Sequence, residues 1–147
     1  MVKIRLINSI KYEINLRQPY IDAFMTKDSL WWKNEINTVD NKINSEQEPF
    51  TKNMYQRIKG FWGIACYSLS KQAITGHDAE TLNKILTIYR MLEPQNPDML
   101  YFSAFPYLWK GNKKATITML KRAFKAGFSD KSQLKKEFPE SILSELY

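Results

Sequence analysis

Two prolines, Pro94 and Pro97, stand between two stretches of helical periodicity and constrain the fold more than any other feature of this chain. Apolar residues recur at helical spacing on both sides: Leu82, Ile85, Leu86, Tyr89 and Leu92 before, and Leu100, Tyr101, Ala104, Phe105 and Leu108 after. A proline inside a helix removes a backbone hydrogen bond and clashes with the preceding turn. The sequence therefore predicts two helices, one ending near Glu93 and one beginning at Pro97 with Asn96 as its N-cap.

Glycines mark the ends of the next two predicted helices. Gly111 can adopt the left-handed conformation that terminates helices, so the helix from Pro97 should end there. A third helix should end at Gly127, which an apolar residue, Phe128, follows as a Schellman ending prefers. Pro106 lies inside the first of these two helices, so we expect that helix to bend within this turn.

The helical pattern repeats with an offset of 34 residues. At this offset Tyr67 corresponds to Tyr101, Ser70 to Ala104, Ile74 to Leu108, Ile85 to Met119 and Leu86 to Leu120. With paired helices, small residues at helix contacts and a proline after the second helix, residues 55–128 resemble the tetratricopeptide repeat family. The resemblance implies stacked helical hairpins in an α–α superhelix, and residues 129–147 would then form helices that cap the open end of the stack.

The opening residues have a different period. Apolar residues alternate with polar ones as in a strand: Val2, Ile4, Leu6, Ile10, Tyr12, Ile14 and Leu16. A short β-hairpin with its loop centred on Ser9 would place these on one face, and the alternative is a helix on Ile7, Ile10 and Ile14. Residues 1–27 are therefore expected to form an N-terminal extension, which ends in a linker that reaches about Thr26.

Residues 28–128 are expected to form the helical hairpins of a mainly α, single-domain chain. Asp28, Asp78 and Asp130 stand where three further helices should begin. A long helix from Thr51 to about Ala73 contains Gly60 and Gly63, each of which costs about 1 kcal/mol relative to alanine. We therefore expect these glycines to lie at a close contact between helices.

Charge is concentrated in one part of the chain. At 147 residues, with 44% hydrophobic and 25% charged residues, the composition is that of one ordinary globular domain. The formal net charge is +7, and residues 99–147 hold nine Lys and Arg against four Asp and Glu. Eight of these nine are lysines, which favours diffuse attraction over bidentate recognition.

Residue types that carry chemistry are sparse. Cys66 is the only cysteine and cannot form an internal disulfide; its place on an apolar helical stripe predicts a buried, inert thiol. His77, the only histidine, falls in a turn beside Asp78, as a loop or capping residue does. We find no metal-ligand spacing and no glycine run that would hold a phosphate. The sequence predicts no catalytic, cofactor-binding or metal-binding residues and no enzyme.

No stretch predicts a membrane span. The longest uncharged runs, Gly60–Ser70 and Met99–Trp109, fall well short of the roughly 20 residues that a helix needs to cross a bilayer. The charged opening residues do not form a signal peptide. We therefore expect a cytoplasmic location by default. If a leader has been removed from the chain, we expect an exported protein instead.

Aromatic and basic residues supply the candidate binding surface. Aromatics make up 14% of the chain and crowd the two matched hairpins. They either pack between repeats or line a groove and anchor a peptide. The lysines form either a solvated face or a surface for an acidic partner. Candidate partner-binding residues are Trp62, Tyr67, Tyr101, Phe105, Trp109, Lys110, Lys113, Lys114 and Lys121.

These features predict a non-catalytic helical-repeat module that binds a protein or peptide as part of an assembly. Two alternatives stay open. One is binding of nucleic acid or another polyanion through the basic C-terminal third. The other is a structural or accessory module of an enzyme.

Overall fold

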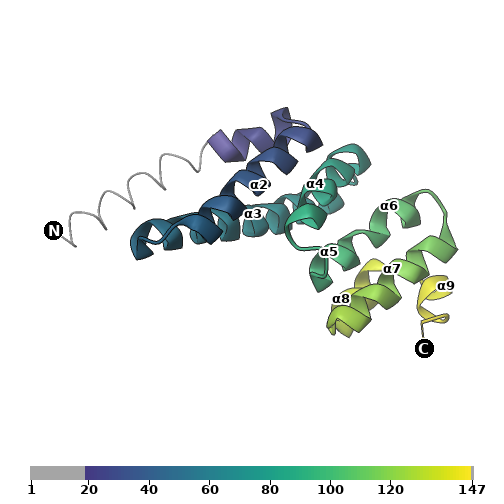
Figure 1. The fold of residues 1–147 in the computed structure, drawn as a ribbon. Helices are drawn as coiled ribbons and strands as arrows, with labels where there is room; N and C mark the ends of the chain where they lie inside the picture. Colours follow the sequence, from purple (N-terminus) through teal and green to yellow (C-terminus); the bar gives the residue numbers. More distant parts are fainter. Residues whose placement is uncertain (1–18, 147) are drawn as a thin grey trace. The chain divides into compact units, whose positions relative to one another are not determined.

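The computed structural model describes residues 19–146, which are built from helices and turns and contain no strand (Figure 1). The labelled helices are α2 (Ser29–Ser45), α3 (Pro49–Thr75), α4 (Ala79–Leu92), α5 (Pro97–Phe102), α6 (Ala104–Trp109), α7 (Lys113–Ala126), α8 (Lys131–Glu137) and α9 (Glu140–Leu143). The prediction of a mainly α chain is confirmed. The β-hairpin predicted for the opening residues lies outside the described part.

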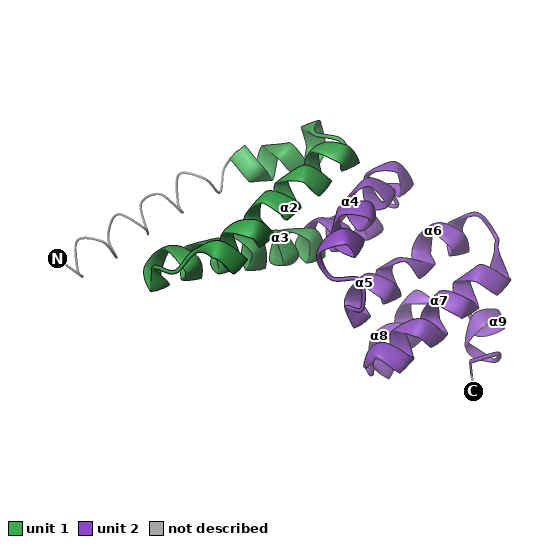
Figure 2. Ribbon diagram, in the orientation of Figure 1, with its two compact units in different colours: residues 1–68 green, residues 69–147 purple. Residues whose placement is uncertain are grey.

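The chain divides into two compact units, residues 1–68 and residues 69–147 (Figure 2). The division falls inside α3, so the prediction of a single domain over 1–147 stays a prediction.

Residues 19–26 of unit 1 are helical, where the sequence predicts a linker. The linker prediction is wrong. The segment is too short to show a long periodic stripe of apolar residues, and aromatic packing stabilises its helix instead. Phe24 is fully buried and stacks on Trp32 with ring centroids 4.3 Å apart. The Trp32 indole N–H donates to the Ala23 carbonyl at 3.1 Å. Trp62 of α3 completes this cluster, with its ring edge-on to Trp32 at 5.4 Å.

Gly60 on α3 does not lie at a close helix contact. It is exposed, and a Cβ at this position would meet no described atom within 4 Å. The expectation of a helix contact at Gly60 is therefore wrong. Gly60 lowers the stability of α3 relative to alanine and gains no packing contact in return.

The 34-residue offset reappears in the helix bounds of unit 2. Helix α4 spans Ala79–Leu92 and α7 spans Lys113–Ala126, so both ends are shifted by 34 residues. Their N-caps, Asp78 and Asn112, differ by the same offset and have similar backbone angles, φ −97°, ψ 88° and φ −85°, ψ 83°. The sequence repeat thus corresponds to a repeat of helix starts and ends in this unit.

Side-chain caps fix the helix starts. Each of the cap residues accepts a hydrogen bond from the backbone N–H three residues later, at 2.9–3.1 Å: Asp28, Asp78, Asn96, Asn112 and Asp130. Such a cap contributes about 0.5–2 kcal/mol to helix stability. The predicted starts at Asp28, Asp78, Asn96 and Asp130 are confirmed.

The helix ends in unit 2 use residues in the left-handed conformation. Gly111 has φ 76° and Gly127 has φ 118°, as predicted. After Gly127 the Phe128 N–H donates to the Ala123 carbonyl at 2.9 Å, which is the 6→1 hydrogen bond of a Schellman motif. At the end of α3 the left-handed residue is His77, with φ 52°.

Pro106 interrupts the helix that follows Asn96. Helix α5 ends at Phe102 and α6 begins at Ala104, so the break falls at Ser103, within the turn that precedes the proline. The Ser103 hydroxyl donates to the Met99 carbonyl at 2.7 Å. The predicted bend at this turn is therefore present as a break between two short helices.

Tyr101 is at the centre of the unit 2 core. It is fully buried and stacks on Phe128 with ring centroids 4.1 Å apart and an interplanar angle of 7°. Phe138, which follows α8, meets the same ring edge-on at 5.6 Å. The segment after Gly127 thus packs on the helix that contains Tyr101.

Candidate functional site

The nine predicted partner-binding residues are divided between the two units. Trp62 and Tyr67 belong to unit 1, and the other seven belong to unit 2. The site described below is therefore built from residues of unit 2 alone.

Three of the predicted aromatics are core residues. Trp62 and Tyr101 are 0% exposed and Phe105 is 3% exposed. Their ring contacts are with other core aromatics, such as Phe105 with Phe138 at 4.8 Å. Buried rings present no surface to a partner, so these three side chains stabilise the fold and do not line a groove.

The Tyr101 hydroxyl is engaged inside unit 2. It donates to Glu137 Oε1 at 2.9 Å. Burial, and then the hydrogen bond and negative charge of Glu137, raise the pKa of Tyr101 well above its usual value of about 10. The phenol is therefore a neutral donor at all ordinary pH values.

Trp109 and Tyr67 retain partial exposure. Trp109 lies at the end of α6, and its ring stacks on His77 with centroids 4.1 Å apart and an interplanar angle of 26°. This stack joins the turn after α3 to the end of α6. One face of the Trp109 ring is thus covered by His77. Through this contact Trp109 holds the two turns together.

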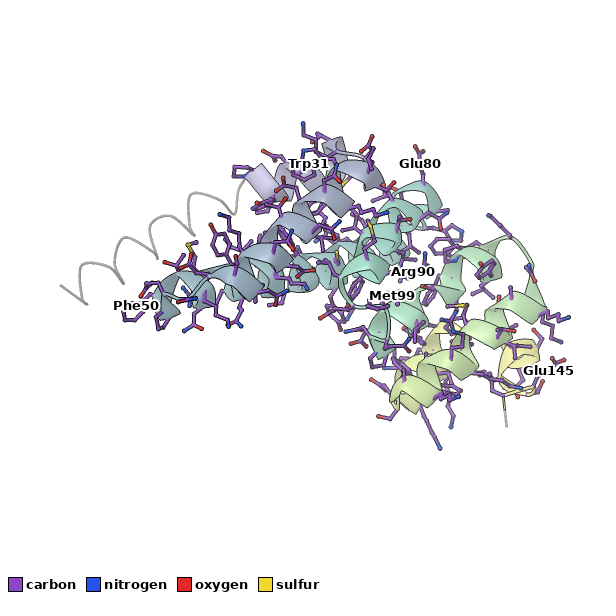
Figure 3. All side chains as sticks on the ribbon, in the orientation of Figure 1. Trp31, Phe50, Glu80, Arg90, Met99 and Glu145 are labelled. Carbon is purple, nitrogen blue, oxygen red and sulfur yellow. The ribbon has the colours of Figure 1, made fainter. Side chains whose placement is uncertain are left out.

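The four predicted lysines are all exposed. Lys113 pairs with Glu145 at 2.8 Å, the carboxylate labelled near the C-terminal end of unit 2 in Figure 3. Lys110, Lys114 and Lys121 make no ion pair with any residue of 19–146. Three of the four predicted lysines therefore keep their charge available to a partner.

Helix α7 separates its basic residues from its apolar ones. Its buried residues are Thr116, Met119, Leu120 and Ala123. Lys113 at its first position is paired with Glu145, and its other exposed cationic residues, which we call the α7 basic face, are Lys114, Lys121, Arg122 and Lys125. Lys114, Lys121 and Lys125 are spaced by seven and four residues, and Arg122 is adjacent to Lys121 and three residues before Lys125, so the four follow one side of the helix.

An open hollow lies beside this face, at the join of α6 and α7. It has a volume of about 320 Å³. Its lining residues are Tyr107, Asn112, Lys114, Ala115, Thr118 and Met119. We call it the Tyr107 hollow, because Tyr107 is 39% exposed and is the only large apolar side chain of described unit 2 with so much exposed surface.

A second cation stands at the Met119 side of the hollow. The Arg122 Nη1 lies 3.6 Å from the Met119 Sδ, and Lys114 is itself one of the lining residues. The Tyr107 hollow therefore combines apolar surface with one cation in its lining, Lys114, and a second, Arg122, against the lining residue Met119. Such a site can hold an apolar group that has anionic neighbours.

Sequence reasoning missed the residues that form the apolar wall of this hollow. Tyr107 lies off the apolar stripe of Tyr101, Phe105 and Leu108, of which Tyr101 and Phe105 are buried. That offset was the available signal, because an aromatic residue off the stripe is directed away from the core. The break at Ser103 and the position of α7 decide the rest, and neither follows from residue spacing.

Within the described residues, no cluster of three or more His, Cys, Asp or Glu side chains is placed to hold a metal ion. Cys66 is fully buried, which confirms the predicted burial of its thiol. Across residues 19–146 no helix combines the length and apolar character that crossing a membrane requires. No protein-family model, characterised protein or solved structure matches this chain.

Proposed function

We propose that this protein is a non-catalytic binding module that receives an acidic protein or peptide on the α7 basic face. The observation that carries the proposal is the Tyr107 hollow, where the exposed Tyr107 lies with Lys114 in one lining and Arg122 contacts the lining residue Met119. A solvated lysine face needs no apolar hollow beside it. Tyrosine and arginine next to a concave apolar surface are the residues that supply most of the energy in protein interfaces.

The proposed fold is an array of stacked helical hairpins of the tetratricopeptide type. It is supported by the repeat of helix bounds between α4 and α7 and by the matching caps Asp78 and Asn112. Modules built in this way present extended surfaces to protein partners. The proposal therefore places the partner on one repeat, the α6–α7 hairpin.

The test compares two kinds of acidic ligand by fluorescence anisotropy. One is a pool of short acidic peptides that share one net charge and vary at a single apolar position; the other is a single-stranded DNA of equal charge. The full chain, Tyr107→Ala and Leu30→Ala are compared at low and moderate salt. Leu30 is the matched control because it is an exposed apolar residue of unit 1, 63% exposed.

We expect the peptide pool to lose less affinity than the DNA as salt rises, because apolar contact is not screened. Tyr107→Ala should weaken peptide binding and leave DNA binding unchanged, and Leu30→Ala should affect neither. Tighter binding of the DNA, with a steep salt dependence and no effect of Tyr107→Ala, would instead assign the basic face to nucleic acid.

A further inference from the structure

The two cations of the Tyr107 hollow have a fixed spacing. Lys114 and Arg122 are eight residues apart on one helix, and at 1.5 Å per residue their Cα atoms are separated by about 12 Å along the axis of α7. The lining residues Ala115, Thr118 and Met119 lie between them. The apolar lining residues thus lie along α7 between a lining lysine, Lys114, and Arg122, which contacts the lining residue Met119.

An extended peptide matches this spacing. Its backbone advances about 3.3 Å per residue, so residues four positions apart are about 13 Å apart. Alternate side chains of an extended chain point to the same side, so the residue midway between those two faces the same surface. The pattern that fits is an acidic residue, any residue, an apolar residue, any residue and a second acidic residue.

Building on the proposed function, we propose that the Tyr107 hollow receives one apolar side chain from an extended partner segment. The acidic residues two positions before and two positions after that side chain then pair with Lys114 and Arg122. The volume of about 320 Å³ is at the lower end of the roughly 300–1,000 Å³ of ligand pockets. It is therefore large enough to receive an anchoring side chain.

The charges around the hollow favour this occupant. Lys114 makes no ion pair with a described residue, and the Asn112 side-chain oxygen already accepts the Ala115 N–H at 3.1 Å. The lining residues include no carboxylate. An acidic ligand consequently meets Lys114 in the lining and Arg122 beside Met119, and no carboxylate among the lining residues.

The test uses three synthetic peptides of the same length and charge. The first has the proposed pattern with leucine in the centre. In the second, serine replaces that leucine, and in the third both acidic residues are moved next to the leucine. Affinities for the full chain are measured by fluorescence anisotropy at moderate salt.

We expect the first peptide to bind about tenfold more tightly than the second, because burying most of a leucine side chain contributes on that scale. The third should also bind more weakly than the first, since its charges no longer reach both cations. Ala115→Leu narrows the hollow with a good helix former and should reduce the advantage of leucine without changing the serine peptide. Thr118→Leu, one helical turn further along α7, should do the same.

Charge variants complete the test. Lys114→Gln and Arg122→Gln should each weaken the first peptide several-fold. Lys136→Gln, the same charge change on exposed α8, should have a much smaller effect.

The outcomes separate this inference from the proposed function. Equal affinity for all three peptides, unchanged by Ala115→Leu and Thr118→Leu, would overturn the inference while leaving acidic-peptide binding in place. No binding of any acidic peptide, even at low salt, would overturn both.

Discussion

The effect of an alanine substitution at a glycine in this chain depends on the backbone conformation of that single residue. Gly60 lies inside α3 with open space around its Cα, and Gly127 ends α7 with φ 118° and equally open space. A steric clash is thus ruled out at both positions. Only the intrinsic cost of each backbone conformation differs.

Gly60→Ala should raise the free energy of unfolding by about 0.5–1 kcal/mol, because alanine loses less entropy in a helix. Gly127→Ala should lower it by about 1–2 kcal/mol, because a Cβ disfavours the left-handed conformation. Urea unfolding followed by circular dichroism measures both. Shifts of the same sign for the two variants would contradict the conformations described for these glycines.

Tyr101 predicts an alkaline loss of stability. Its pKa is raised in the folded state, first by burial and then by Glu137, whereas the unfolded chain titrates near pH 10. The folded state therefore keeps a proton that the unfolded state releases, and stability is retained below about pH 10 and lost above it, by about 1.4 kcal/mol per pH unit.

Tyr101→Phe removes this titration, so its free energy of unfolding should fall less steeply between pH 9 and pH 11 than that of the parent chain. At neutral pH the same variant should be less stable by about 1.5–3 kcal/mol, because a hydrogen bond to a charged group is lost. If the free energies of unfolding of the parent chain and of Tyr101→Phe fall in parallel between pH 9 and pH 11, the Tyr101 hydroxyl is not buried against Glu137.

At the scale of helices, the first and last residues of most helices could be predicted from the sequence because they depend on local chemistry. Asp28, Asn96 and Asp130 cap helices, and Gly111 and Gly127 end them, through bonds within a few residues. The helix at residues 19–26 was not readable, because it depends on the packing of Phe24 on Trp32. Tertiary contacts override weak local signals in such short segments.

Pro106 gives the element-scale prediction. Because proline has no N–H, the turn that contains Ser103 lacks one helical hydrogen bond, and α5 and α6 are separate helices. Pro106→Ala supplies the missing donor, so the two should merge into one continuous helix at little cost in stability. Hydrogen exchange should show a protected amide at position 106.

If the amide of residue 106 exchanges rapidly in Pro106→Ala, the break between α5 and α6 is imposed by packing and not by the proline. The control is Pro97→Ala. That residue occupies the first helical turn, where the missing N–H has no intrahelical partner in any case.

At the scale of the whole molecule, the sequence predicted the basic character of the site better than its shape. The excess of lysine in residues 99–147 needed only a count, and Lys110, Lys114 and Lys121 are indeed exposed. The apolar part was misplaced, because Trp62, Tyr101 and Phe105 are core residues. Helical spacing identifies which residues share a face, but not which face the fold buries.

The central claim is that an acidic protein segment binds one defined surface of unit 2. The most direct measurement is an NMR titration of the full chain with the leucine-centred acidic peptide, followed through backbone amide shifts. We expect saturable shifts concentrated at Tyr107, Ala115, Thr118 and Met119, with no change at Lys42, an exposed lysine of α2 in unit 1. Shifts that never saturate and that affect Lys42 as much as Thr118 would contradict a defined site and leave only general attraction between opposite charges.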